Sequence, residues 1–262
     1  MLIRTALAAL AFASAAPAQA QLHASDIILT VENNAIVTNS VVGPDLEPNR
    51  VFGIDLQLSG GFWAVANPGF DCDPGTFPTG SDNVFRFVDA VREWDGNDFD
   101  SYADEQMSIE FGPAGPVFTP VSPGGEVLGF GIPIQSNGGW HRHYDYYLEA
   151  PADPGVYLLS LVIENTSTGD ETETFYIIFN RSMAEAELLA AIDFMQNSLV
   201  GCPANLNTDD TINAADLSIL LSAFNSTPET ANWNEIADLN GDNEVGPSDL
   251  SILLSVFGDG CP

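Results

Sequence analysis

One segment occurs twice near the end of this 262-residue chain, at a constant offset of 33 residues. Residues 205–217 read NLNTDDTINAADL and residues 238–250 read DLNGDNEVGPSDL, and each copy runs into an almost identical apolar stretch, SILLSAF or SILLSVF. Ankyrin repeats have a similar period, but they need more than two copies and carry a T-P-L-H signature that is absent here. The acidic and amide residues explain the repeat better.

These oxygen-bearing residues follow the spacing of a calcium-binding loop, which uses side chains at positions 1, 3 and 5, a carbonyl at position 7 and a carboxylate at position 12. The first copy offers Asn205, Asn207, Asp209, the carbonyl of Thr211 and Asp216, and the second offers Asp238, Asn240, Asp242, the carbonyl of Glu244 and Asp249. We therefore expect two calcium ions. The second loop should bind more tightly, because it has three carboxylates against two.

Two other loop positions carry structural expectations. Position 6 usually needs glycine for a sharp turn, and Asp210 and Asn243 stand there, two residue types that tolerate the left-handed region. Position 8 is apolar in both copies, Ile212 and Val245, and we expect these two residues to pair the loops across a short bridge.

Paired calcium loops, each followed directly by one helix, resemble the type I dockerin family, whose members plug secreted enzymes into cohesin-bearing scaffolds. The resemblance covers residues 202–262 and implies calcium binding and a cohesin-type partner. The chain departs from the family at position 1, where Asn205 replaces the usual aspartate. It also departs at positions 10 and 11, where Ala214-Ala215 and Pro247-Ser248 replace the matched pair that commonly meets cohesin.

The first twenty residues read as a secretory signal peptide. Arg4 precedes an apolar run and small residues that end in Ala18-Gln19-Ala20, and Ala16-Pro17-Ala18 is an alternative cleavage site. The apolar run is shorter than the roughly 20 residues that cross a bilayer. We therefore expect a secreted or surface-exposed protein with no membrane span.

The chain has 37 acidic and 6 basic residues, and all six are arginine. The absence of lysine excludes Schiff-base chemistry on a lysine. Six scattered arginines cannot form the basic patch that nucleic-acid binding requires, so we expect no nucleic-acid partner. A hydrophobic fraction of 45% is that of a folded globular protein.

Three cysteines follow the signal peptide. Cys202 and Cys261 lie just outside the two ends of the repeat, and we expect them to form a disulfide, which an exported protein permits. A closed loop of about 60 residues would stabilise the fold by roughly 4 kcal/mol. Cys72 is then buried, free or intermolecular.

Residues 21–181 alternate short apolar runs with Gly, Pro, Asn and Asp, which predicts a mainly β domain, an antiparallel β-sandwich of the jelly-roll kind. The candidate strands are residues 26–31, 35–38, 51–57, 84–88, 107–111, 127–134, 140–148, 156–163 and 173–179. A connecting helix is expected within residues 182–200, with Ser182 and Glu185 as its capping box. The small α-helical, EF-hand-like module then occupies residues 201–262.

The candidate site of the sandwich is the stretch WHRHYDY at residues 140–146. Side chains two apart on a strand share a face, so His141, His143 and Asp145 should point the same way. Two imidazoles on one face suit zinc or copper. His23, the third histidine, lies beside the first strand and is a further possible ligand, with Asp71 or Asp73 as other candidates. The alternative is an exposed edge strand whose histidines are merely ion-paired.

The sandwich also resembles exported bacterial proteins, namely zinc-regulated secreted proteins with a PEP-CTERM anchor and surface-anchored repeats with a histidine-rich strand. Four stretches carry this resemblance: HASDIIL from His23, NPGFD from Asn67, PGVYLL from Pro154 and FYIIFN from Phe175. It implies a metal-related, non-catalytic role at a surface.

The contrasting hypothesis is a polysaccharide-degrading enzyme, such as a glycoside hydrolase, or a carbohydrate-binding accessory, because dockerin-like tails often accompany such proteins. A glycosidase needs two carboxylates across a cleft. Glu93, Asp95, Glu110 and Glu149 are candidates that the sequence does not rank, and Trp63, Trp94 and Trp140 could stack on sugars or pack in the core. The sequence favours a binding protein, with a metal ion or an extracellular polysaccharide as its ligand.

Overall fold

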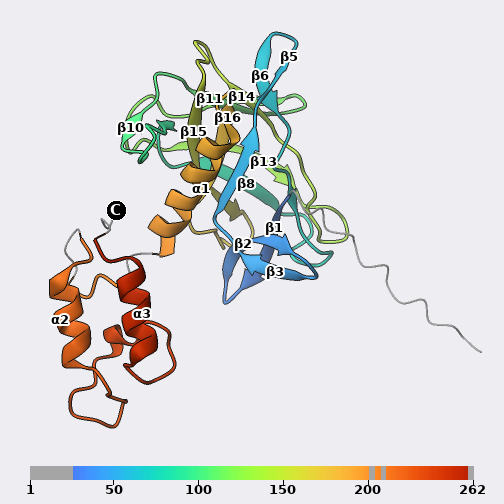
Figure 1. Cartoon of the computed structure of the whole chain (residues 1–262). Helices are drawn as coiled ribbons and strands as arrows, with labels where there is room; N and C mark the ends of the chain where they lie inside the picture. Colours follow the sequence, from blue (N-terminus) through green and yellow to red (C-terminus); the bar gives the residue numbers. More distant parts are fainter. Residues whose placement is uncertain (1–25, 201–203, 208–210, 259–262) are drawn as a thin grey trace, which may run out of the picture.

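The computed structural model describes residues 26–200, 204–207 and 211–258. Strands form most of the regular secondary structure in the described chain, and three α-helices follow them (Figure 1). These helices are α1 (Glu185–Val200), α2 (Ala214–Ser222) and α3 (Pro247–Ser255), with a 3₁₀ turn η1 (Glu235–Ala237) between the last two. The predicted fold class, a β-sandwich followed by a small helical module, is confirmed.

The strands form three sheets. The seven-stranded sheet contains β4 (Val51–Asp55), β8 (Asp82–Phe87), β9 (Arg92–Glu93), β10 (Ser101–Tyr102), β13 (Val127–Pro133), β15 (Gly155–Asn165) and β16 (Phe175–Arg181). The five-stranded sheet runs in the order β12 (Ala114–Phe118), β11 (Met107–Phe111), β14 (Asp145–Leu148), β6 (Phe62–Val65), β5 (Gln57–Ser59). The four-stranded sheet runs β3 (Asp45–Pro48), β2 (Ala35–Val42), β1 (Ile27–Glu32), β7 (Phe70–Asp71). Two pairs are parallel, β1 with β7 and β4 with β16, so the sheets are not purely antiparallel as expected.

Strand β15 is buried on both faces, and its two faces belong to different cores. Leu159 and Leu161 join the main core, which also contains Ile109 and Tyr146 of the five-stranded sheet. The alternate residues of β15, such as Leu158, pack in a second core with α1. Because successive strand residues point to opposite faces, the domain has three layers: the five-stranded sheet, the seven-stranded sheet and α1.

The start of α1 differs from the prediction. The predicted capping box on Ser182 was wrong, because Ser182 has a φ of 62°, whereas an N-cap residue is extended. The helix begins at Glu185, and Asn180 organises the turn before it. The Asn180 side chain accepts a bond from the N–H of Met183 at 3.0 Å and donates to the Met183 carbonyl at 3.1 Å.

The predicted strand 140–148 was wrong in its first half, since only Asp145–Leu148 forms β14. Before Asp145 the segment makes one antiparallel bridge, between Arg142 and Phe70 of β7. The side chains still alternate, because Trp140 and Tyr144 are fully buried while His141 and His143 are about one-third exposed. The two-residue strands β7, β9 and β10 were not predicted, since they are too short to show a period.

In the part of the chain that the structure describes, no helix combines the length and the apolar character needed to cross a membrane. The predicted signal peptide, His23, Cys202 and Cys261 lie outside the described residues. The domain limits proposed from the sequence stay predictions.

Candidate metal centres

The second repeat forms a loop whose oxygen atoms are already gathered by backbone N–H groups. The Asp249 side chain is fully buried, and its carboxylate accepts bonds from the N–H groups of Leu239 at 2.8 Å, Asn240 at 3.2 Å and Gly246 at 2.7 Å. Asp238 accepts from three further N–H groups, at loop positions 4, 5 and 6. An all-oxygen donor set held by the backbone fits calcium, a hard cation.

The first repeat has the same arrangement around Asp216, which is also fully buried. Its carboxylate accepts bonds from the N–H groups of Leu206 at 2.8 Å, Asn207 at 3.2 Å and Asn213 at 2.8 Å. These distances match those around Asp249 to within 0.1 Å. The predicted ligand Asp209 and its neighbour Asp210 lie outside the described residues, so the first loop is seen only in part.

Each loop also contains a side-chain hydrogen bond at its candidate ligands. In the second, Asn240 Nδ2 donates to Asp242 Oδ2 at 2.9 Å, so the ligands at positions 3 and 5 already touch. In the first, Asn213 Nδ2 donates to the carbonyl of Thr211 at 3.1 Å, the predicted position-7 ligand. Gly246 occupies the equivalent of Asn213 and has no side chain to make this bond to Glu244. In the first loop, a calcium ion would therefore compete with the Asn213 side chain for the lone pairs of the Thr211 carbonyl.

The expected left-handed turn at position 6 is present in the second loop, where Asn243 has a φ of 66°. The expected bridge between the two position-8 residues was wrong. The N–H of Val245 donates to the carbonyl of Ser226, and the carbonyl of Val245 accepts from the N–H of Asn225 at 2.7 Å. Likewise, the carbonyl of Ile212 accepts from the N–H of Gly258 at 2.8 Å. Each loop is thus tied to the segment that follows the other repeat's helix.

The second candidate centre is a cluster of Asp26, His141 and His143. The two Nε2 atoms lie 3.0 Å apart, and Asp26 Oδ2 lies 3.7 Å from that of His141 and 3.6 Å from that of His143. A point equidistant from the three atoms lies about 2.0 Å from each, which is the ligand distance of zinc to imidazole nitrogen and carboxylate oxygen. The Asp26 side chain is fully buried, and the rings are about one-third exposed.

The ring of His143 is held in one orientation by contacts at its Nδ1 atom. Its Nδ1 lies 3.0 Å from the carbonyl oxygen of Ala66 and 3.1 Å from Oδ1 of Asn67. A carbonyl oxygen only accepts, so Nδ1 carries the proton, and in the neutral ring Nε2 presents its lone pair toward Asp26 and His141. A hydrogen bond of this kind to the remote ring nitrogen is typical of histidines that bind metals.

The structure brings together only part of the predicted ligand set. His141 and His143 meet as expected, but Asp145 lies outside the cluster, because it begins the paired strand β14 opposite Glu110 and is exposed. Asp26 supplies the carboxylate instead and was missed, since nothing in the sequence shows that β1 and residues 141–143 flank β7. Of the other candidates, Asp71 is buried and its Oδ1 accepts from the N–H of Cys72.

The tryptophans proposed to stack on sugars serve packing. Trp140 is fully buried, contacts Phe70 and Tyr144, and donates from Nε1 to the carbonyl of Ile132 at 3.2 Å. Trp94 packs between Phe99 and Phe194. Trp63 lies under the guanidinium of Arg181, 4.4 Å from ring centre to Cζ.

The candidate acids do not face one another across a described cavity. Glu93 lies on β9, and burial together with Glu105, Asp104 and Asp153 raises the pKa of its carboxyl. Glu149 accepts a bond of 2.6 Å from the hydroxyl of Ser108 in the five-stranded sheet. None of Glu93, Asp95, Glu110 and Glu149 lines any of three cavities of about 260, 330 and 580 Å³.

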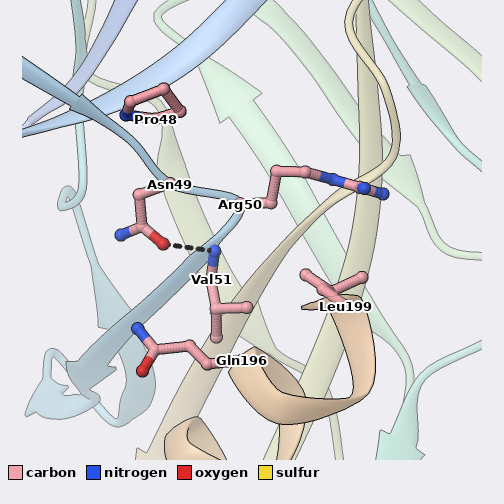
Figure 2. A pocket seen from close by; sticks show the side chains of 6 residues that line it. All are labelled: Pro48, Asn49, Arg50, Val51, Gln196 and Leu199. Carbon is pink, nitrogen blue, oxygen red and sulfur yellow. Dashed lines mark hydrogen bonds between the residues drawn. The ribbon is translucent and has the colours of Figure 1, made fainter. Parts of the chain in front are cut away.

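The cavity of about 330 Å³ lies between the segment before β4 and the end of α1 (Figure 2). Two of its polar residues have partners: Asn49 Oδ1 accepts from the N–H of Val51 at 3.0 Å, and Arg50 pairs with Glu173. The cavity of about 580 Å³ lies on the seven-stranded sheet beside α1. Asp89, Arg92 and Tyr102, which line it, bond to one another. Burial opposes the charged form of Asp89, but bonds from the Gly124 N–H and from Arg92 outweigh it and lower the pKa.

Comparison with known families identifies the C-terminal part. The type I dockerin domain family matches residues 205–255, so this part of the chain is a type I dockerin module. No curated protein matches the chain.

Among the solved structures that match parts of the chain are two with low sequence identity and low TM-scores. The N-terminal domain of PorA has 12% identity and a TM-score of 0.29 over 60% of this chain and 98% of that one. A C-terminal interface mutant of a type II cohesin–X-dockerin complex from Acetivibrio cellulolyticus has 16% identity and a TM-score of 0.21 over 60% of this chain and 83% of that one.

Proposed function

We propose that this chain, which ends in a type I dockerin module, is an exported binding protein that the module attaches to a cohesin-bearing scaffold. The match of residues 205–255 to the dockerin family carries the proposal. The sandwich is then the part that the scaffold displays, and we propose that it binds a transition-metal ion.

Calcium would be held by the ligands that the repeat predicts. In the second loop these are Asp238, Asn240, Asp242, the carbonyl of Glu244 and Asp249, and in the first their counterparts at the same positions. The buried Asp216 and Asp249 support this assignment, because each is placed by three backbone N–H bonds beside the other ligands. When bound, calcium neutralises carboxylates that would otherwise repel one another.

The cohesin would meet the exposed faces of α2 and α3. These faces carry small residues around Leu221 and Leu254, which are 51% and 53% exposed and occupy equivalent positions of the repeat. They carry no exposed charge, in a chain with a net charge of −31. Uncharged surfaces around an exposed apolar anchor are typical of the centre of a protein interface.

The attachment is tested by measuring binding of the mature chain to immobilised type I cohesins, with calcium and with a chelator. We expect calcium-dependent binding that Leu254→Asp weakens at least tenfold. Leu58→Asp is the control, since Leu58 is 63% exposed on β5 of the sandwich. Failure of a calcium-loaded chain to bind any member of a broad cohesin panel would contradict the attachment.

The transition-metal ion would be held by Asp26, His141 and His143. The observation that supports this site is the mutual approach of two imidazole nitrogens and a buried carboxylate within 3.7 Å. Two imidazoles and a carboxylate suit zinc or copper. His23 remains a further candidate ligand.

Titration of the mature chain with Zn²⁺ and Cu²⁺, with calcium saturating throughout, tests this site. We expect one equivalent to bind to the unmodified chain and this binding to be lost in the His141→Ala/His143→Ala variant. A His23→Ala variant measures the contribution of the third histidine. Equal binding by the unmodified chain and the double variant would show that the general acidity of the protein, not the cluster, holds the ion.

A further inference from the structure

The candidate site in the sandwich lies where three chain segments that are distant in the sequence meet through backbone hydrogen bonds. The N–H of Ile27 donates to the carbonyl of Gly69 at 2.8 Å. Phe70 and Arg142 exchange a pair of bonds of 2.7 and 2.9 Å. Strand β7 has only two residues, and it pairs with β1 over two positions and with Arg142 through one bridge. A metal ion bound across this junction would add a cross-link between its two outer segments.

The three ligands flank this junction. Asp26 immediately precedes Ile27, and His141 and His143 stand on either side of Arg142. An ion bound to all three would therefore connect the first strand directly to the segment that leads into β14. The connection would cross over β7, which lies between the two.

Gly69 makes this approach possible. A Cβ atom on Gly69 would lie 2.6 to 2.8 Å from the ring atoms Cε1, Nδ1 and Nε2 of His143, closer than real contacts allow. The N–H of Gly69 also donates to Asp26 Oδ1 at 3.3 Å. Gly69 thus leaves room for His143 and bonds to Asp26. The Ala66 carbonyl and the Asn67 side chain hold the His143 ring through its Nδ1 atom.

We infer that the metal ion acts as a structural clamp, which fastens β1 to residues 141–143, and that Gly69 is a positioning residue of the site. The inference rests on the proposed transition-metal site and adds its role. Zinc is the ion expected, because two imidazole nitrogens and a carboxylate oxygen are a normal zinc donor set and a clamp requires no redox change. Metal binding then stabilises the folded junction, since the unfolded chain lacks the preformed site.

The clamp is tested on the mature chain with calcium saturating, by adding one equivalent of ZnCl₂. Calorimetry measures the stoichiometry, and hydrogen exchange measures the protection of the amides of Ile27, Phe70 and Arg142. We expect one equivalent to bind and the exchange of these amides to slow at least tenfold. The His141→Ala/His143→Ala variant should show no such slowing.

The metal site and its role as a clamp are contradicted by different results. Stoichiometric binding without added protection at the junction would overturn the clamp and leave the metal site standing. Absence of stoichiometric binding would overturn both.

The role of Gly69 is tested by a double-mutant cycle. Its φ is not in the left-handed region, so alanine is compatible with the backbone. Gly69→Ala should weaken zinc binding about 10- to 100-fold, the range typical of groups that orient a ligand. In the His143→Ala background, Gly69→Ala should not weaken zinc binding any further, because the added methyl group no longer meets the His143 ring. An equal loss in both backgrounds would overturn the positioning role.

Asn67→Ala is a second variant in case Gly69→Ala does not fold. It removes one acceptor of His143 Nδ1 and leaves the Ala66 carbonyl. We expect weaker zinc binding in the presence of His143 and no effect in its absence. An effect independent of His143 would contradict the assignment of Asn67.

Discussion

The two candidate metal centres of this protein are built in opposite ways. Each predicted calcium loop has its candidate ligands within twelve consecutive residues, and in the second loop the backbone of the same residues positions Asp249. The cluster combines Asp26 with His141 and His143, which are distant from it in the sequence, and a third segment, around Gly69, lies between them. A local site is encoded by spacing alone, whereas a long-range site exists only after the sheets have paired.

This difference also bears on stability. The dockerin module has a small core of its own, around Leu220, Val245 and Leu253, and its two buried carboxylates lie directly beneath the loops. The sandwich has a much larger core, and we expect that core to form without an ion. Calcium should therefore determine whether the module folds, while zinc should affect one junction of a domain that folds without it.

Calcium removal gives the largest effect that we expect. Calcium at about a thousand times its dissociation constant adds about 4 kcal/mol to stability, which is a large share of what a module of this size can have. Chelation should unfold α2 and α3 and leave the sandwich folded. Circular dichroism at 222 nm and the sandwich's own thermal transition, each with and without chelator, check this. A single transition that chelation shifts as a whole would show that the two parts are not independent.

The cluster is tested most sharply by exchanging one carboxylate at a time. Asp26→Asn removes the charged ligand that the structure places at the site, and we expect zinc binding to weaken about a hundredfold or more. Asp145→Asn removes the carboxylate that the sequence placed there. It should change affinity by no more than about twofold, as surface substitutions do. Isothermal titration of both variants checks this, and the reverse ranking would mean that β14 continues through the histidines in solution.

The errors of sequence interpretation follow the same division between local and long-range structure. The left-handed Asn243 and the two helices were predictable, because each depends on a few neighbouring residues. The pairing of Val245 with Ser226 was not, since it connects one repeat to the other. Asp26 was missed for the same reason: its place beside the histidines depends on a parallel pair and a single bridge.

The alternation of residues 140–146 shows what a pattern of period two establishes. It correctly placed His141 and His143 on one side. Tyr144 and Tyr146, which have the opposite parity, are fully buried. It did not show which strand the segment would pair with, or where pairing would begin. Asp145 is an even number of residues from the histidines, as a residue on the same face should be. It belongs to the paired part of β14, however, and therefore lies away from the cluster.

Within the module, the two loops are predicted to differ in affinity. Asn205→Asp adds the missing carboxylate at position 1 of the first loop and should tighten its calcium binding about tenfold, because ligand charge tunes such loops. Asp238→Asn makes the opposite change at the same position of the second loop and should weaken it about tenfold. Calcium titrations that resolve the two sites check the order. Tighter binding by the unmodified first loop would show that the bond from Asn213 to the Thr211 carbonyl organises the loop and does not compete with the ion.

The smallest effect concerns Cys72, which directly follows β7, the strand that pairs with β1 and with Arg142. The cysteine is buried and free, and burial raises the pKa of its thiol to about 11. The thiolate is the form that binds metals and reacts with alkylating agents, and it forms only as the pH approaches that pKa. At pH 8 the folded protein should therefore leave Cys72 unmodified by iodoacetamide, and Cys72→Ala should change zinc affinity by no more than about twofold. Mass-spectrometric mapping of the alkylated sites, before and after unfolding in guanidinium, checks whether Cys72 is protected in the folded protein. The same map shows whether Cys202 and Cys261 are protected by the predicted disulfide. A loss of zinc binding in Cys72→Ala would mean that the thiol binds the ion. The ligand set would then include Cys72, at the end of β7.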